Sequence, residues 1–141
     1  MIKNFDRDGI QFQYPANWTL DLDEGGNGWT VVLQSPATAF SLISLRPDAD
    51  TPSQVATEAL DALKQEYSEL EADQAIDNIA GQPAVGHDIE FLTLDTSIIC
   101  WTRCFESSAG PVLVLCQTSE YDREMNEPVL RAICASIQTE D

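Results

Sequence analysis

The chain has 141 residues, and its 24 Asp and Glu residues against 7 Lys and Arg residues give a formal net charge of −17. A polyanion of this strength gains nothing from contact with a phosphate backbone and is repelled by anionic lipid surfaces, so we expect no nucleic acid and no membrane among its partners. A hydrophobic content of 43% is enough for a folded core, and the length suits a single domain over residues 1–141.

The first third of the chain predicts short strands. Residues 10–14 and 18–22 alternate between apolar and polar side chains, which is the pattern of half-buried strands. Residues 29–34 and 40–45 are predicted as two further strands, with the Ser35-Pro36 break between them. The acidic, glycine-rich segment 23–28 is predicted as a turn.

A helix is predicted to run from Pro52 to about residue 71. Thr51 suits the N-cap, proline is favoured at the first helical position, and Gln54 follows Thr51 at the spacing of a capping box. Apolar side chains then recur at helical spacing and form one face. They are Val55, Ala59, Leu60, Leu63, Tyr67 and Leu70.

The second half predicts a sheet that is covered on both faces. Strands are predicted at 75–80, 84–93, 98–105 and 112–116, the last two as an antiparallel hairpin with a longer loop at 106–111 that pairs Trp101 with Cys116. These two strands are apolar on both faces, as in a sheet with no wet side. A second helix is predicted from Asn126, after a shorter helical turn at 120–125. The expected fold class is α+β, a three-layer α/β/α sandwich around a central antiparallel sheet.

Several segments, in order along the chain, form a recognisable series. The series begins at Phe12-Gln13-Tyr14-Pro15-Ala16-Asn17-Trp18. It continues through the Ser35-Pro36 break, the acidic helix after Pro52 and the run from Ile79 to Ala84, and it ends at Ala135-Ser136-Ile137. In this order the segments resemble the PsbP-like superfamily, which includes PsbP, the Ran-binding Mog proteins and DcrB-like bacterial proteins. The resemblance implies an α/β/α sandwich around an antiparallel sheet, and a function as a non-enzymatic adaptor or chaperone-like factor.

The compartment expected from the sequence is the cytoplasm. The N-terminus is polar and charged from Lys3 onward, so it lacks the apolar stretch of a secretory signal. Four cysteines (Cys100, Cys104, Cys116 and Cys134) are expected as reduced, buried thiols. Cys100 and Cys104 fall on one strand face about 13 Å apart, too far for a disulfide or a shared metal.

Two sequence features invite a chemical role, and each has a structural alternative. His87 shares a predicted strand face with Val85, Ile89 and Phe91, so we expect a core histidine rather than a catalytic base. The segment 21–28 resembles the start of a calcium loop, but Val32 stands where the loop needs a glutamate, which favours a plain acidic turn. We expect no cofactor and no metal.

The candidate protein-binding residues lie on the last hairpin and on the first helix. Trp101, Arg103 and Phe105 share one strand face, and Arg and Trp are enriched in binding hot spots, although the same pattern suits a face under the terminal helix. In that second case Arg103 would be a paired structural residue. The acidic helix residues include Glu58, Asp61 and Glu66, which form either a solvated face or a docking face for a basic partner.

Three functions stay open at this point. The leading hypothesis is a small, acidic, non-enzymatic adaptor with a protein partner that carries positive charge. The second is a small-ligand-binding protein or enzyme that uses a pocket near His87 and the cysteines. The third is a homodimer that buries the Trp101–Phe105 surface.

Overall fold

A seven-stranded antiparallel sheet forms the centre of the structure, a computed structural model that describes residues 1–140. Its strand order is β3-β4-β5-β9-β8-β7-β6, and a second sheet has the order β1-β2-β10. The strands are β1 (Ile2–Arg7), β2 (Ile10–Pro15), β3 (Thr19–Asp23), β4 (Trp29–Gln34), β5 (Phe40–Leu45), β6 (Leu70–Ile79), β7 (Gln82–Thr93), β8 (Thr96–Ser107), β9 (Gly110–Ser119) and β10 (Gln138–Thr139). The helices are α1 (Pro52–Glu66) and α2 (Arg123–Ala135), and a 3-10 turn at Glu120–Asp122 precedes α2.

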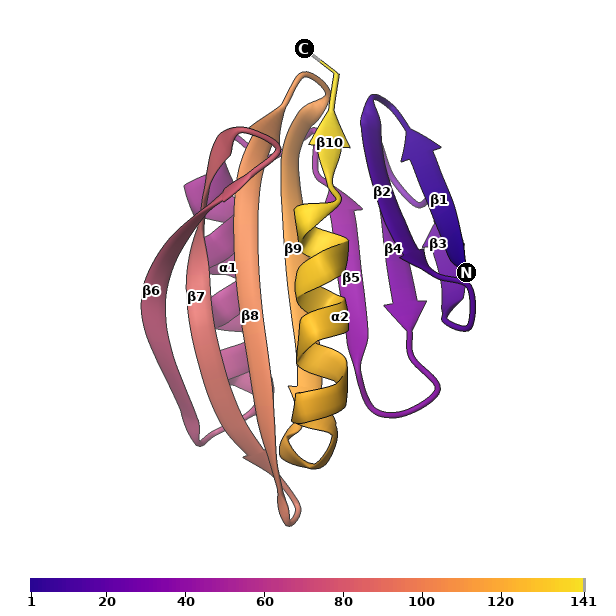
Figure 1. The fold of residues 1–141 in the computed structure, drawn as a ribbon. Coiled ribbons are helices and arrows are strands. Elements are labelled where there is room, and N and C mark those ends of the chain that lie inside the picture. Colours follow the sequence, from indigo (N-terminus) through magenta and orange to yellow (C-terminus); the bar gives the residue numbers. More distant parts are fainter. Residues whose placement is uncertain (141) are drawn as a thin grey trace.

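The two helices pack on opposite faces of the large sheet (Figure 1). On one face, α1 lies against β7, β8 and β9, where Val55 and Ala56 contact Cys104 and Leu113. On the other face, α2 and the small sheet build the larger core. Leu130 and Ile133 of α2 join a cluster there that includes Ile10, Phe12, Val31, Trp101 and Phe105. The three-layer arrangement expected from the sequence is confirmed.

The predicted hairpin of β8 and β9 is confirmed, including the pairing of Trp101 with Cys116. Its loop is shorter than predicted, because Glu106 still pairs with Pro111 and Ser107 with Gly110. Only two residues connect the strands. Gly110 adopts a φ of 130°, a conformation that is strained for residues with a side chain, so the glycine permits the tight turn.

Helix α1 begins as predicted, with Thr51 as N-cap and its side chain accepting a hydrogen bond from Gln54 N. It ends at Glu66 rather than near residue 71, and β6 already begins at Leu70. Tyr67 turns into an extended conformation and stacks on Phe91 at 4.0 Å between ring centroids. Tyr67 and Leu70 therefore reach the core from extended chain, although their spacing is that of a helix.

Two further predictions differ from the structure. Helix α2 starts at Arg123 and contains Pro128, whereas the sequence predicted a start at Asn126; the helical turn expected around 120–125 is present. The small sheet was not predicted beyond β2. β1 exposes most of its side chains and β10 has two residues, so neither carries a clear apolar alternation.

Candidate functional site

Trp101, Arg103 and Phe105 share one face of β8, as predicted, but the structure places them in the interior. Their exposed fractions are 3%, 4% and 0%. Phe105 lies in the core cluster below α2, and the guanidinium of Arg131 lies over the Trp101 ring at 4.4 Å. A protein partner or a second copy of the chain cannot contact this face while α2 covers it, which corrects its use as a binding or dimer surface.

Arg103 is instead a paired structural arginine. Its Nε donates to Asp77 Oδ2 at 2.6 Å and its Nη2 donates to Asp88 Oδ1 at 2.7 Å, while Nη1 donates to the carbonyl oxygens of Thr102 and His87. Burial by itself would lower the pKa of Arg103, but hydrogen bonds to Asp88 and Asp77 outweigh it and raise the pKa. The side chain therefore stays charged and ties β8 to β6 and β7.

The sheet surface beside α2 is strongly acidic. Five carboxylates from β6 and β7 lie on this face, and all five residues are exposed. We call them the acidic sheet face: Glu71, Asp73, Asp77, Asp88 and Glu90. No continuous acidic run in the sequence marks these residues, because an apolar or neutral residue stands next to each of them. Only the pairing of β6 with β7 brings them together.

Two pairs of like charge lie directly opposite each other within the acidic sheet face. Glu71 pairs with Glu90, and Asp73 pairs with Asp88. Like charges at directly opposed positions destabilise an antiparallel pair. Among residues 1–140, Asp77 and Asp88 have Arg103 as a cation within 4.0 Å, whereas Glu71, Asp73 and Glu90 have none.

A groove of about 280 Å³ separates the acidic sheet face from α2. On the sheet side it is lined by Glu71, Asp73, Asp88 and Glu90, and on the helix side by Arg123, Glu127 and Arg131. Arg123 is ion-paired with Glu120 and Glu127. A hydrogen bond from Arg123 is the main reason that the pKa of Glu127 is lowered. The helix side is thus largely neutralised, and the sheet side keeps its negative charge.

The predicted acidic helix residues form a second, separate surface. Glu58, Asp61 and Glu66 are exposed on α1, which lies on the opposite face of the sheet from α2. Gln54 donates to Glu58 at 3.4 Å, and none of the three acids has a cation within 4.0 Å among the described residues. The structure therefore does not bring these residues together with Trp101, Arg103 and Phe105.

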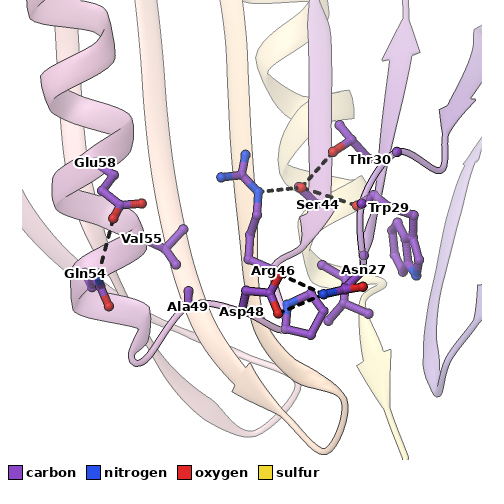
Figure 2. Close-up of a pocket in the computed structure, with 15 residues that line it drawn as sticks. Asn27, Trp29, Thr30, Ser44, Arg46, Asp48, Ala49, Gln54, Val55 and Glu58 are labelled. Carbon is purple, nitrogen blue, oxygen red and sulfur yellow. Dashed lines mark hydrogen bonds between the residues drawn. The ribbon is translucent and has the colours of Figure 1, made fainter.

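A groove of about 410 Å³ lies where α1 begins, next to the turn between β3 and β4 (Figure 2). Asn27 Nδ2 donates to both oxygens of Asp48, and Arg46 Nε donates to Ser44 Oγ. Figure 2 shows Arg46 extending between the strands and α1, on which Glu58 lies. The lining carries Arg46 together with Asp48 and Glu58, so both signs of charge are present in the groove.

A local hydrogen bond stabilises the glycine-rich turn at 23–28, in which Asp23 Oδ1 accepts from Gly25 N at 3.0 Å. Val32 lies in β4, inside the sheet. Within residues 1–140, no three His, Cys, Asp or Glu side chains gather so that they could hold a metal ion. The turn predicted at 23–28 is present between β3 and β4.

Cys100 and Cys104 lie on the α1 face of β8, on either side of the position opposite His87. Burial raises the pKa of both thiols to about 12, so neither forms a thiolate near neutral pH. Cys116 and Cys134 lie on the other face, with their sulfur atoms 3.6 Å apart. The predicted pairing of Cys116 with Trp101 already implies that Cys116 lies on the other sheet face from Cys100 and Cys104. The contact with Cys134 depends on how α2 packs and was not predicted.

His87 faces α1, together with Val85, Ile89 and Phe91, as predicted. Its backbone N–H donates to Thr102 Oγ1 at 3.1 Å, and its carbonyl oxygen accepts from Arg103. The ring atom Nδ1 is buried and has no hydrogen-bond partner in the described structure.

No helix among residues 1–140 is both long and apolar enough to cross a lipid bilayer.

The comparisons with known proteins identify the fold. No family model and no curated protein sequence matches the chain. Among solved structures, it is similar to the cyanobacterial PsbP protein (CyanoP) from Synechocystis sp. PCC 6803, with 14% identity, 99% of this chain and 92% of that chain covered, and a TM-score of 0.71.

Two further structures match over nearly the whole chain. PA94 from Pseudomonas aeruginosa, a protein of unknown function, is 15% identical with a TM-score of 0.61, covering 99% of this chain and 98% of its own. LpqN of Mycobacterium tuberculosis, involved in cell envelope biogenesis, is 14% identical with a TM-score of 0.55, covering 99% and 91%. At these identities the likeness concerns the fold, and it agrees with the resemblance found in the sequence: the chain has the PsbP-like fold.

Proposed function

We propose that the protein is a non-enzymatic adaptor that binds a basic segment of a partner protein on the acidic sheet face. The observation that carries this proposal is the pair of opposed like charges, Glu71 with Glu90 and Asp73 with Asp88. Such pairs oppose folding, and proteins commonly give up stability where a surface serves a function. A cationic partner would remove the repulsion on binding.

The position of β6 supports a segment that binds as an extended chain. Within residues 1–140, β6 is an edge strand of the large sheet, so one side of its backbone has no neighbouring strand. A peptide that adds to such an edge contributes backbone hydrogen bonds, and its alternate side chains face the same sheet surface. Lys or Arg at alternate positions would then lie beside Glu71, Asp73 and Asp77.

The groove beside α2 supports the same charge preference. Its helix-side arginines already have acidic partners, so they do not compete strongly for the sheet carboxylates. A partner's Lys or Arg side chain entering the groove would meet Glu71 and Glu90 on one wall. Complementary charge of this kind speeds association and selects the partner more than it adds affinity.

The test compares two triple variants that remove the same number of charges. Glu71→Gln/Asp73→Asn/Glu90→Gln neutralises the acidic sheet face, and Glu58→Gln/Asp61→Asn/Glu66→Gln neutralises the helix acids. The ligand is a short synthetic peptide with Lys at alternate positions, titrated at physiological salt and followed by NMR chemical-shift mapping. We expect the sheet variant to weaken binding about tenfold or more, and the helix variant to weaken it much less.

The same three proteins then serve as baits in an extract of the source cell. A true partner is recovered with the unmodified protein and the helix variant and is lost with the sheet variant. Equal loss of peptide binding in both variants would show only a general charge effect. That result, or the absence of any protein that distinguishes the two variants, would refute the proposal.

A further inference from the structure

A second surface of the molecule has a different chemistry, in the groove between α1 and the β6–β7 hairpin. Its volume is about 580 Å³, within the range of small-molecule sites. We call it the His87 groove. Its walls include Ala56 and Thr57 of α1, Gln74 and Ile76 of β6, and Val85 and His87 of β7.

The His87 groove carries no Asp, Glu, Lys or Arg among its lining residues. In contrast, charged side chains line both the groove beside α2 and the groove at the start of α1. The walls combine small apolar side chains with neutral polar ones such as Thr57 and Gln74. A site of this composition accepts a neutral molecule, because neither sign of charge would find a counter-charge in its walls.

Exposed apolar surface and an unpaired polar atom occur together in this groove. Ile76 is 71% exposed although it belongs to a regular strand. The buried Nδ1 of His87 has no hydrogen-bond partner among residues 1–140, while the backbone groups of the same residue are both satisfied. Buried polar atoms are nearly always paired, so an orphan beside an open groove points to a partner from outside the chain.

We infer that the His87 groove binds a small, neutral, amphipathic molecule with an apolar body and one hydroxyl or N–H group. The apolar body would cover Ile76, Val85 and Ala56. Nδ1 exposes almost no surface in this conformation, so the imidazole would first turn about its Cβ–Cγ bond to present Nδ1 to the groove. There Nδ1 accepts the ligand's hydrogen when the imidazole is neutral and protonated at Nε2. The site lies on the opposite face of the sheet from the acidic sheet face, so it does not depend on the proposed adaptor function.

The experiment uses N-phenyl-1-naphthylamine, a neutral aromatic amine with one N–H group, whose fluorescence rises in apolar surroundings. His87 is the only histidine of the chain, so its ring nitrogens give a single, unambiguous set of NMR signals. We expect saturable binding of one molecule per chain. At saturation, the Nδ1 resonance of His87 is expected to shift.

Three variants locate the binding. Thr57→Trp places a large side chain at an exposed position on the groove wall, and Ala62→Trp places the same side chain at an exposed position of α1 that does not line the groove. We expect Thr57→Trp to weaken binding at least tenfold and Ala62→Trp to leave it unchanged. His87→Phe keeps the ring and removes the acceptor, and we expect it to weaken binding about fivefold.

Any of three results would overturn the inference. They are the absence of saturable binding, equal binding by Thr57→Trp and Ala62→Trp, and an Nδ1 resonance that stays in place at saturation. The variant Glu71→Gln/Asp73→Asn/Glu90→Gln is expected to bind the amine normally. Failure of the adaptor proposal is therefore distinguishable from failure at this groove.

Discussion

Arg103 links three neighbouring strands of the large sheet through its ion pairs. It is almost fully buried, and its ion-pair partners Asp77 and Asp88 come from two neighbouring strands. The sequence indicated a paired arginine, because a charge between two aromatic residues on an apolar strand needs compensation. It could not name the partners, because they depend on the registers of β6, β7 and β8, which local patterns do not reveal.

Replacing Arg103 by methionine is expected to lower the free energy of unfolding by about 2–3 kcal/mol. Methionine keeps the buried volume but leaves the carbonyl oxygens of Thr102 and His87 without this donor. It also leaves the two carboxylates without their cation. The effect is below that of a fully buried pair, because both aspartates are about half exposed. Urea denaturation measures the change.

Arg123→Met is the matched control, because Arg123 has two acidic partners at the surface. Exposed pairs of this kind contribute little, so the control should change the free energy of unfolding by less than about 1 kcal/mol. If Arg103→Met were no more destabilising than Arg123→Met, burial of Arg103 would have no energetic consequence, and our interpretation would be wrong.

Cys134 differs from the other three cysteines. It is partly exposed on α2, whereas Cys100, Cys104 and Cys116 are buried. A hydrogen bond from the Cys116 thiol is the main reason that the pKa of Cys134 is lowered, although burial acts in the opposite direction. The Trp101 indole and the charges of Arg131 and Arg103 also lower it. The sequence treated all four cysteines alike, since their difference arises from the contact between α2 and the sheet.

Iodoacetamide is expected to label the native protein first at Cys134, because the thiolate is the reactive form. The labelling rate rises with pH, and its midpoint should lie below that of an unperturbed thiol. Cys116→Ala should move the midpoint upward, because it removes the hydrogen bond that contributes most to the lowered pKa. Mass spectrometry of digested samples locates the label. Faster labelling at Cys100 or Cys104 would contradict the burial described here.

At the scale of whole elements, the sequence predicted β4 and β5 to the residue and the start of α1 with its cap. It misplaced the end of α1. The apolar spacing of Tyr67 and Leu70 continues the helical pattern by chance. Both residues lie in extended chain and pack against a core cluster that contains Phe91. Apolar periodicity therefore indicates which residues are buried. It identifies a helix only when an extended chain could not bring the same residues to the core.

The β6–β7 hairpin allows a direct test of its opposed charges. Glu90→Lys places a cation opposite Glu71, and we expect it to raise the free energy of unfolding by about 0.5–1 kcal/mol. Glu71→Lys/Glu90→Lys restores like charges with the opposite sign and should lose this local gain. Thermal and urea unfolding of the three proteins give the comparison. Equal stability of the single and double variants would show that the opposed charges do not interact.

For the whole molecule, the sequence predicted the layered architecture, because the strands of the last hairpin are apolar on both faces and two helices are available to cover them. The PsbP-like fold was expected from the resemblance of several segments, in order along the chain, to that superfamily. The sequence did not predict the small sheet, in which β2 pairs with the preceding β1 and with β10 near the other end of the chain. It also placed the binding residues on a strand that α2 covers. Which strand face a helix covers is decided by packing, and several placements satisfy the same apolar pattern.

The alternation along β7 links the two proposed surfaces. Asp88 belongs to the acidic sheet face, and its neighbour His87 belongs to the groove on the other side. Gly86 precedes His87 in β7 and lies against the backbone of Thr102. A Cβ atom at position 86 would stand 1.9 Å from the carbonyl oxygen of Thr102, so only glycine fits there. A single inserted or deleted residue within β7 would exchange the sides of every residue beyond it. Substitutions in β7 can therefore change one surface at a time. An insertion or deletion would remove the acidic sheet face and the His87 groove together.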